Sequence, residues 1–274
     1  MLKLNKNLFW LAQLKKDFLI DFSYKISFFG QFFGILLTAI SFFFISETFI
    51  ESKSPHLEPF NYDYFVFATI GIAILDTVIT IMRALTTSLR DAQSFGYIEL
   101  LFISYINASY IFLCSALYPF LKSIFRFFIY IFFLQLIGNH EFLLISVVFS
   151  VLLFFIMLIP FIALSFLALS FVLYFKQADP VNFLISLLVS IFSGILYPVS
   201  VLPLFMQDIS NLIPFTSQLN SARHVLINNS MDLYIFSNAF FIDILFSLLF
   251  LFFSFQIFKI TIHLVKKRGT ISVY

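Results

Sequence analysis

Four ionisable residues fall inside stretches of this sequence that are otherwise apolar: Asp76, Lys122, Arg126 and Asp243. A charge at the centre of a bilayer costs about 2.5–3.5 kcal/mol, so such residues face a bundle interior or a polar cavity and often mark a transport path. Three uses are open for them: structural ion pairs, a polar lining that contacts an anionic head group, and a proton relay.

No other pattern for chemistry is present in the sequence. The seven glycines lack the GxxxxGK[ST] spacing whose backbone amides bind phosphate, and GxSxG, HExxH and paired carboxylates are also absent. The four histidines lie far apart, and the lone Cys114 leaves no disulfide to form. We therefore expect no catalytic residue, no metal site and no cofactor bound by this chain. Energy for any work would come from another chain or an ion gradient.

The composition predicts an all-α membrane protein. Hydrophobic residues make up 61% of the 274 residues and charged residues 11%, against about 25% charged in soluble domains. Lipid requires every backbone polar group to be paired within its own segment, which favours helices. The net charge of +2 gives no reason to expect nucleic acid as a partner; the expected surroundings are membrane lipid.

Six apolar segments are long enough to cross a bilayer, and we expect residues 1–274 to form a single transmembrane domain. The expected spans are 26–46, 62–85, 108–137, 142–175, 183–199 and 234–259. Residues 1–25 are basic and amphipathic, which predicts a helix at the membrane interface. With both termini cytoplasmic, twelve Lys and Arg residues lie inside and two outside, as the positive-inside rule requires.

Depth along the spans predicts which charges meet. At 1.5 Å per residue, Lys122 lies roughly 20 Å from the cytoplasmic end of its span, and Asp243 roughly 12–14 Å from the outer end. These depths overlap, so we expect Asp243 to pair with Lys122 or Arg126. Asp76 lies nearer the inner face and fits Lys122 better than Arg83 on its own helix.

Two connecting segments are expected to hold short helices. Residues 86–107 are cytoplasmic, too polar at the front to continue the preceding span, and can form a helix along the membrane over Tyr97–Tyr105. Residues 200–233 mix apolar residues with prolines, which favours two short re-entrant helices in the outer leaflet, broken near Pro214.

Small residues mark expected helix contacts. Gly30 and Gly34 form a GxxxG pair in the first span, and Ser186, Ser190 and Gly194 repeat every four residues in the fifth. Such stripes allow helix backbones to approach closely. They favour a homodimer through Gly30, Gly34, Ser190 and Gly194, with packing inside one chain as the alternative.

Three stretches together resemble the permeases of type-2 ABC transporters. The first intracellular loop of that family is matched by Arg90, Asp91, Gly96, Ile98, Glu99, Leu100 and Leu101, with Tyr97 in place of the usual Thr and no following Pro. The second cytoplasmic loop is matched by Lys176, Asp179 and Pro180. The fifth span and outer helices are matched by Gly194, Pro198, Leu202, Pro203, Pro214, Thr216 and Arg223.

The resemblance implies the membrane subunit of an ATP-driven exporter in a bacterial cytoplasmic membrane, multi-pass and not itself an enzyme. Such subunits pair with a second copy or a similar permease, and each contacts a separate ATPase subunit that binds ATP and Mg. The residues implied for a coupling helix at that contact are Arg90, Asp91, Phe95, Gly96, Tyr97, Glu99 and Leu100. The substrate would be lipid-like, a hydrophobic drug or a glycan.

A second interpretation is a stand-alone secondary transporter that uses the four intramembrane charges as an ion path. Internal inverted repeats would favour it, but none is evident between residues 26–137 and 142–259.

Overall fold

The computed structural model describes residues 6–49, 55–60, 63–138, 142–228 and 238–268. Its central element is α3 (Tyr64–Ser94), which is buried over most of its length and packs against helices from both halves of the chain. The Asp63 side chain caps its first turn by accepting the amide of Val66 at 3.0 Å. Because α3 packs against α2, α5, α6, α7 and α9, it forms the core around which the other spans are arranged.

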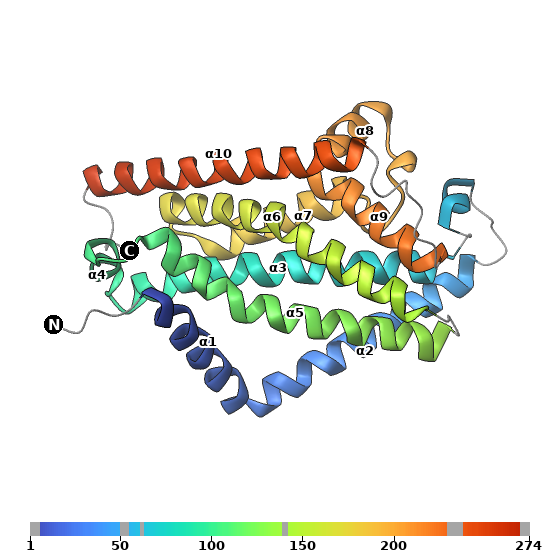
Figure 1. Cartoon of the computed structure of the whole chain (residues 1–274), viewed down its shortest axis with the longest axis horizontal. Coiled ribbons are helices and arrows are strands. Elements are labelled where there is room, and N and C mark those ends of the chain that lie inside the picture. The colour runs from blue at the N-terminus through green and yellow to red at the C-terminus, as the bar shows by residue number, and fades with distance from the viewer. Residues whose placement is uncertain (1–5, 50–54, 61–62, 139–141, 229–237, 269–274) are drawn as a thin grey trace.

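Five of the described helices are long and apolar enough to cross a membrane. They are α2 (Lys25–Phe49), α3, α5 (Ala108–Gly138), α6 (Leu144–Phe175) and α10 (Asn238–Arg268). In Figure 1, α3, α5, α6 and α10 run side by side, and α2 crosses them at a slant. The prediction of an integral, multi-pass, all-α membrane protein is confirmed by helix length and hydropathy.

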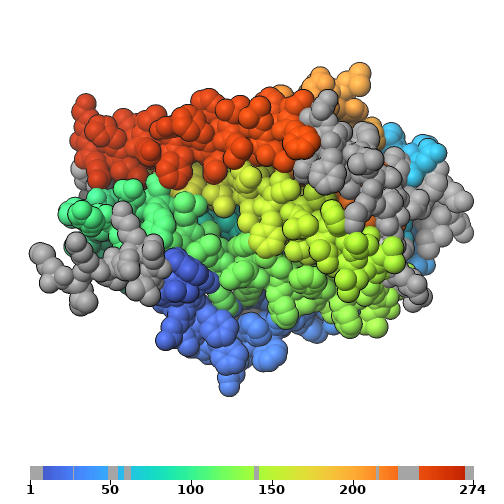
Figure 2. Space-filling model, viewed as in Figure 1, coloured from blue at the N-terminus to red at the C-terminus, as the bar shows by residue number. Residues whose placement is uncertain are grey.

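The outer surface of this bundle is apolar rather than charged. Figure 2 shows α10 as a continuous ridge along one face. Phe241, Leu245, Phe252 and Phe253 on this helix are all more than half exposed. Such a surface is stable in lipid and unstable in water, which agrees with the span assignment.

The predicted fifth span is corrected by the structure. Instead of residues 183–199, helix α7 covers Ala178–Phe192, about 22 Å at 1.5 Å per residue and shorter than the roughly 30 Å hydrocarbon core. It ends where Gly194 adopts a positive φ of 68°, and the chain stays irregular as far as Pro198. Gly194 therefore lies beyond the helix, and the expected four-residue stripe with Ser186 and Ser190 is not formed.

The first residues of the segment 86–107 also differ from the prediction. Residues 86–94 continue α3 as far as Ser94, because Thr86, Leu89 and Ala92 are buried on its packed face. The helix stops at Phe95, and Gly96 follows with φ 74°. The predicted short helix is confirmed as α4 (Ile98–Ile103).

The outer segment forms the two short helices that the sequence predicts. A 3-10 turn, η2 (Val199–Val201), leads to α8 (Leu204–Asn211), and α9 (Pro214–Asn228) follows after a break just before Pro214. A further 3-10 helix, η1 (Pro55–Phe60), lies at the same end of the bundle (Figure 1). The predicted residues 229–233, and 234–237 of the last span, lie outside the described residues.

The N-terminal amphipathic helix is α1 (Lys6–Ser23), and residues 1–5 of the prediction lie outside the described part. Figure 1 shows α1 running obliquely alongside α5 and meeting α2 at a bend near the middle of the bundle. The start of α1, α4 and the basic end of α10 (Lys266, Lys267 and Arg268) all lie at the opposite end from η1. This arrangement agrees with both termini being on one side.

The GxxxG pair of α2 makes no close packing with the described part of this chain. A Cβ added at Gly30 or Gly34 would meet no atom within 4 Å. Among the described residues, nothing therefore supports the intrachain alternative at these two glycines, and the dimer contact stays a prediction.

Gly71 of α3 differs, since a Cβ there would lie 2.2 Å from the carbonyl oxygen of Ile195. We expect Gly71→Ala to destabilise the protein by about 1–3 kcal/mol through overpacking against rigid backbone. Thermal unfolding in detergent measures this, with Gly30→Ala as the matched control, since that site is open. Equal melting temperatures for the two variants would contradict the close approach.

Candidate functional site

Two charged side chains form an ion pair between α3 and α5. The Nη1 atom of Arg126 lies 3.1 Å from Oδ2 of Asp76, and its Nη2 atom donates to the hydroxyl of Thr80 at 2.5 Å. Arg126 is 8% exposed. Asp76 therefore pairs with Arg126, whereas the depth argument predicted Lys122 as its partner.

Lys122 instead holds the bend between α1 and α2. Its ammonium group donates to Asp21 of α1 at 2.5 Å, the hydroxyl of Tyr118 donates to the same carboxylate oxygen at 2.6 Å, and the ring of Phe28 lies 5.7 Å away. Burial acts to raise the pKa of Asp21, but the hydrogen bonds from Lys122 and Tyr118 outweigh it and lower that pKa overall. The sequence analysis did not predict this contact, because it placed residues 1–25 at the membrane interface and considered only Asp76 and Asp243 as partners of Lys122.

Asp243 meets neither of the cations that were expected to pair with it. Its carboxylate accepts a hydrogen bond from the hydroxyl of Ser217 on α9. The reason is lateral position, since α10 packs on α6 and α9 rather than on the face of α5 that carries Lys122 and Arg126. The four predicted intramembrane residues are thus divided among three sites, and only Asp76 and Arg126 form a pair with each other.

Arg223 of α9 is fully buried and binds backbone carbonyls. Its Nε donates to Phe67 at 3.2 Å, Nη1 to Gly194 at 2.7 Å and Nη2 to Ile195 at 2.6 Å. The guanidinium also lies over the Phe67 ring, 3.5 Å from its centroid. Gly194 and Ile195 belong to the irregular segment after α7, where no helix supplies donors to the carbonyls, so Arg223 supplies them just beyond the end of α7. The sequence marked Arg223 only as a motif residue, without this role.

The surface around α4 brings together most of the predicted coupling residues. Ile98 is fully buried and anchors the helix, whereas Leu100 is 70% and Ile103 80% exposed. Glu99 is exposed beside them. Phe95, 78% exposed, lies at the preceding turn. These outward residues (Phe95, Glu99, Leu100 and Ile103) are called the α4 face below.

The remaining predicted residues of this segment have defined places. Asp91 is exposed on the last turn of α3, and its backbone carbonyl accepts the amide of Phe95 at 2.9 Å. Gly96 makes the turn through its positive φ. The pKa of Tyr97 is raised by burial and by the charge of Asp91.

The two loops that carry the family resemblance, both predicted to be cytoplasmic, lie against each other. Arg90, at the end of α3, donates from Nη1 to Oδ2 of Asp179, at the start of α7, over 3.1 Å. Both side chains are well exposed, so the pair adds little to stability. The pair does hold together, at one surface, two segments that are 89 residues apart in the sequence.

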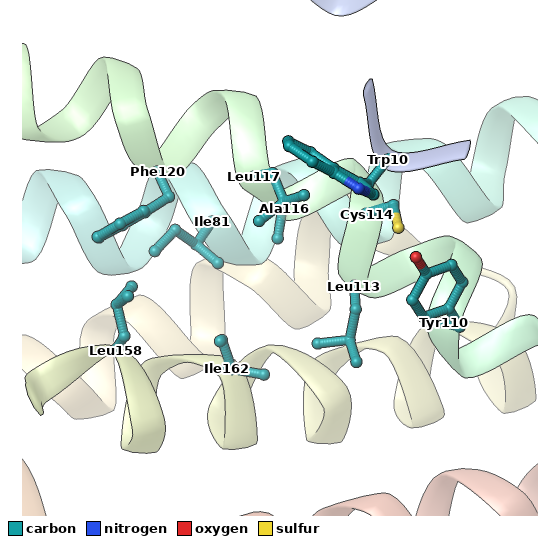
Figure 3. A pocket seen from close by; sticks show the side chains of 10 residues that line it. All are labelled: Trp10, Ile81, Tyr110, Leu113, Cys114, Ala116, Leu117, Phe120, Leu158 and Ile162. Carbon is teal, nitrogen blue, oxygen red and sulfur yellow. The ribbon is translucent and has the colours of Figure 1, made fainter. Parts of the chain in front are cut away.

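Two apolar cavities open onto the surface of the bundle. Figure 3 shows the smaller, about 280 Å³, where Trp10 of α1 lies over Ala116 and Leu117 of α5. The larger, about 610 Å³, lies between α6, α7, α8 and α10 and is walled by side chains such as Phe171 and Phe250. Both have the size and lining of sites for apolar groups.

A metal site is not indicated in the part of the chain that the structure describes, where no group of three or more His, Cys, Asp or Glu residues is close enough to hold an ion. In comparisons with known proteins, no protein-family model and no curated protein sequence matches this chain. The structure defines a helical multi-pass membrane protein with five candidate spans, and the resemblance to type-2 ABC permeases stays a prediction from the loop motifs.

The Asp76–Arg126 pair generates a prediction for a double-mutant cycle. Arg126→Met should destabilise the protein by about 2 kcal/mol, less than for a fully buried pair, because the Asp76 side chain is 29% exposed. Adding Asp76→Asn should restore much of that loss by removing the unpaired charge. Unfolding in detergent gives both values, with Lys25→Gln, at an exposed cation outside this pair, as the control. Additive losses would show that the two charges are not coupled.

Arg223 generates a second prediction. Arg223→Lys keeps the charge but cannot reach three carbonyls with a planar fork, so we expect a loss of about 2–3 kcal/mol, as when buried acceptors lose their donors. Chemical denaturation in detergent measures it. Lys25→Gln, at an exposed cation outside this contact, should change stability by less than about 0.5 kcal/mol. If the Arg223→Lys protein were as stable as the parent, the assigned role would be wrong.

Proposed function

We propose that this chain is the membrane subunit of an ATP-driven exporter and that it docks a separate ATPase subunit on the α4 face. The observation that carries the proposal is the exposure of large apolar side chains on a helix anchored at the basic end of the bundle. Leu100 and Ile103 are 70% and 80% exposed there. A contiguous exposed apolar patch rimmed by charge is a feature of protein interaction sites.

The charges around the α4 face support docking rather than burial in lipid. Glu99 belongs to this face, Arg90 and Asp91 precede it on the end of α3, Asp179 is paired with Arg90, and all four are exposed. Lipid tails disfavour such charges, whereas a protein partner can match them with opposite charges that set specificity. The Arg90–Asp179 contact also means that a partner on this face touches both α3 and α7.

The ATPase subunit, rather than this chain, would bind ATP and Mg, since the sequence has no phosphate-binding loop. Movement of α4 would reach the spans through Ile98, which is buried in the core, and through Arg90, which is part of α3. A second copy of the chain, in contact through Gly30 and Gly34 of α2, would complete the path. The unpacked surface at these glycines supports that contact.

The proposed substrate is lipid-like or hydrophobic. The apolar cavity of about 610 Å³ between α6, α7, α8 and α10 supports this class over a glycan, because a glycan needs hydrogen-bonding groups that the cavity walls lack.

Glu99→Lys tests the docking claim. Reversal of charge in the middle of the α4 face should reduce co-purification with the cognate ATPase about tenfold, equivalent to about 1.4 kcal/mol, and reduce ATP turnover by the complex. The matched control is Glu58→Lys, at an exposed carboxylate in η1 at the other end of the bundle. Unchanged association of the Glu99 variant, or the same loss in both variants, would contradict the docking site.

The alternative, an ion-coupled secondary transporter, has one supporting observation, the Asp76–Arg126 pair within the spans. Reconstituted vesicles distinguish the two. Substrate flux that follows an imposed ion gradient without ATP, and that is lost in Asp76→Asn, favours the alternative. Flux that requires ATP and the partner favours the exporter.

A further inference from the structure

A third cavity, of about 530 Å³, lies at the basic end of the bundle where α10 meets the connection from α4 to α5. Unlike the two apolar cavities, it combines cations, hydroxyl groups and an apolar wall. Its lining includes Lys259, Lys266, Ser104, Ser109, Leu113 and Ile262. The α4 face, where the ATPase is proposed to dock, does not include any of these residues.

The cations come from one face of α10. Lys259 and Lys266 are seven residues apart, which is two helical turns, so both amino groups lie on the same side of the helix. Lys266 donates to the carbonyl of Phe102 at 3.4 Å and lies 5.3 Å from the centre of its ring. Lys259 lies 5.2 Å from the ring of Phe255. Within the described residues neither lysine has a carboxylate partner, and no Asp or Glu lines the cavity.

The α5 side of the cavity offers hydrogen-bond donors. Ser109 is 8% exposed, and its hydroxyl has no hydrogen-bond partner among the described residues. It belongs to the first turn of α5, where the backbone amides precede the first intrahelical acceptor and the helix dipole favours an anion. Two ammonium groups, a buried hydroxyl and a helix start thus face the same space, which is the chemistry that binds a phosphate group.

The apolar wall decides between a lipid and a free phosphate. Leu113, Phe255 and Ile262 line the cavity next to the cations, and a soluble phosphate would gain nothing from them. A phospholipid carries acyl chains next to its phosphate, which matches an apolar wall next to the cations. The basic end of the bundle is the cytoplasmic end by the positive-inside rule, and the cytoplasmic leaflet is the one enriched in anionic lipid.

We propose that this cavity binds the phosphate of an anionic phospholipid from the cytoplasmic leaflet, with Lys259, Lys266 and Ser109 on the head group and Leu113 and Ile262 beside the chains. The site does not depend on the proposed export function. It joins α10 to the α4–α5 connection, two parts of the chain more than 140 residues apart.

The test uses the full-length protein, delipidated in a neutral detergent and titrated with phosphatidylglycerol while bound lipid is counted by native mass spectrometry. A lysine that contacts the bound head group should contribute about 1 kcal/mol to anionic lipid binding. We therefore expect Lys259→Gln to weaken binding about 5-fold and the double variant with Lys266→Gln about 30-fold. Lys267→Gln, at the exposed neighbour that does not line the cavity, is the matched control and should bind as the parent does.

Two further probes identify the source of the phosphate. Phosphatidylcholine, which has no net charge, should bind much more weakly than phosphatidylglycerol, and glycerol 3-phosphate should not compete at concentrations that saturate the lipid. Equal binding of the two lipids, full competition by glycerol 3-phosphate, or an unchanged affinity in Lys259→Gln would overturn the proposal. The single variant keeps the test valid if the double variant fails to fold, and circular dichroism checks the helix content of each.

Discussion

The arrangement of the end of the bundle that holds α8 and α9 depends on one buried guanidinium. Arg223 is 0% exposed and donates to the carbonyls of Phe67, Gly194 and Ile195. Burying a charge is costly, but carbonyls left without donors in a membrane cost several kcal/mol each. By binding the carbonyls of Gly194 and Ile195, which follow the end of α7, the charge makes it possible for α7 to stop at Phe192 inside the bundle. A planar fork with five donors suits this task, and a point charge does not.

The same contact fixes three other features. Gly194 takes a positive φ, so that its carbonyl faces the guanidinium, and Gly71 must lack a Cβ because the backbone at Ile195 comes so near. Arg223 therefore holds its own helix, α9, against α3. Only a short break separates α9 from α8. Irregular backbone at membrane depth is stable only where protein covers it, and here the covering is provided by α3 and α9.

The features of the fold that depend on composition and local pattern could be predicted from the sequence. The bounds 108–137 and 142–175 differ by at most two residues at either end from α5 and α6, and the short helix α4 and the break before Pro214 are also confirmed. It did not predict the end of α7, because that end depends on donors supplied by Arg223, which is distant in sequence. Nor did it predict the charge pairs. Depth along a span fixes a residue's position along the membrane normal, whereas pairing also depends on which helices are neighbours. Asp243 has a depth that would suit the cations of α5, but it lies beside α9.

At the basic end, the short helix α4 has two sides with different surroundings. Six residues cannot form a stable helix alone, so α4 depends on Ile98 in the core and on Phe102, whose ring and carbonyl contact Lys266. Leu100 and Ile103 face outward on the other side. A phosphate bound by Lys266 would compete with the Phe102 contact and so act directly on the support of the outward face. The proposed binding of lipid and the proposed docking of a partner would then be linked through α4, because both act on the same six residues.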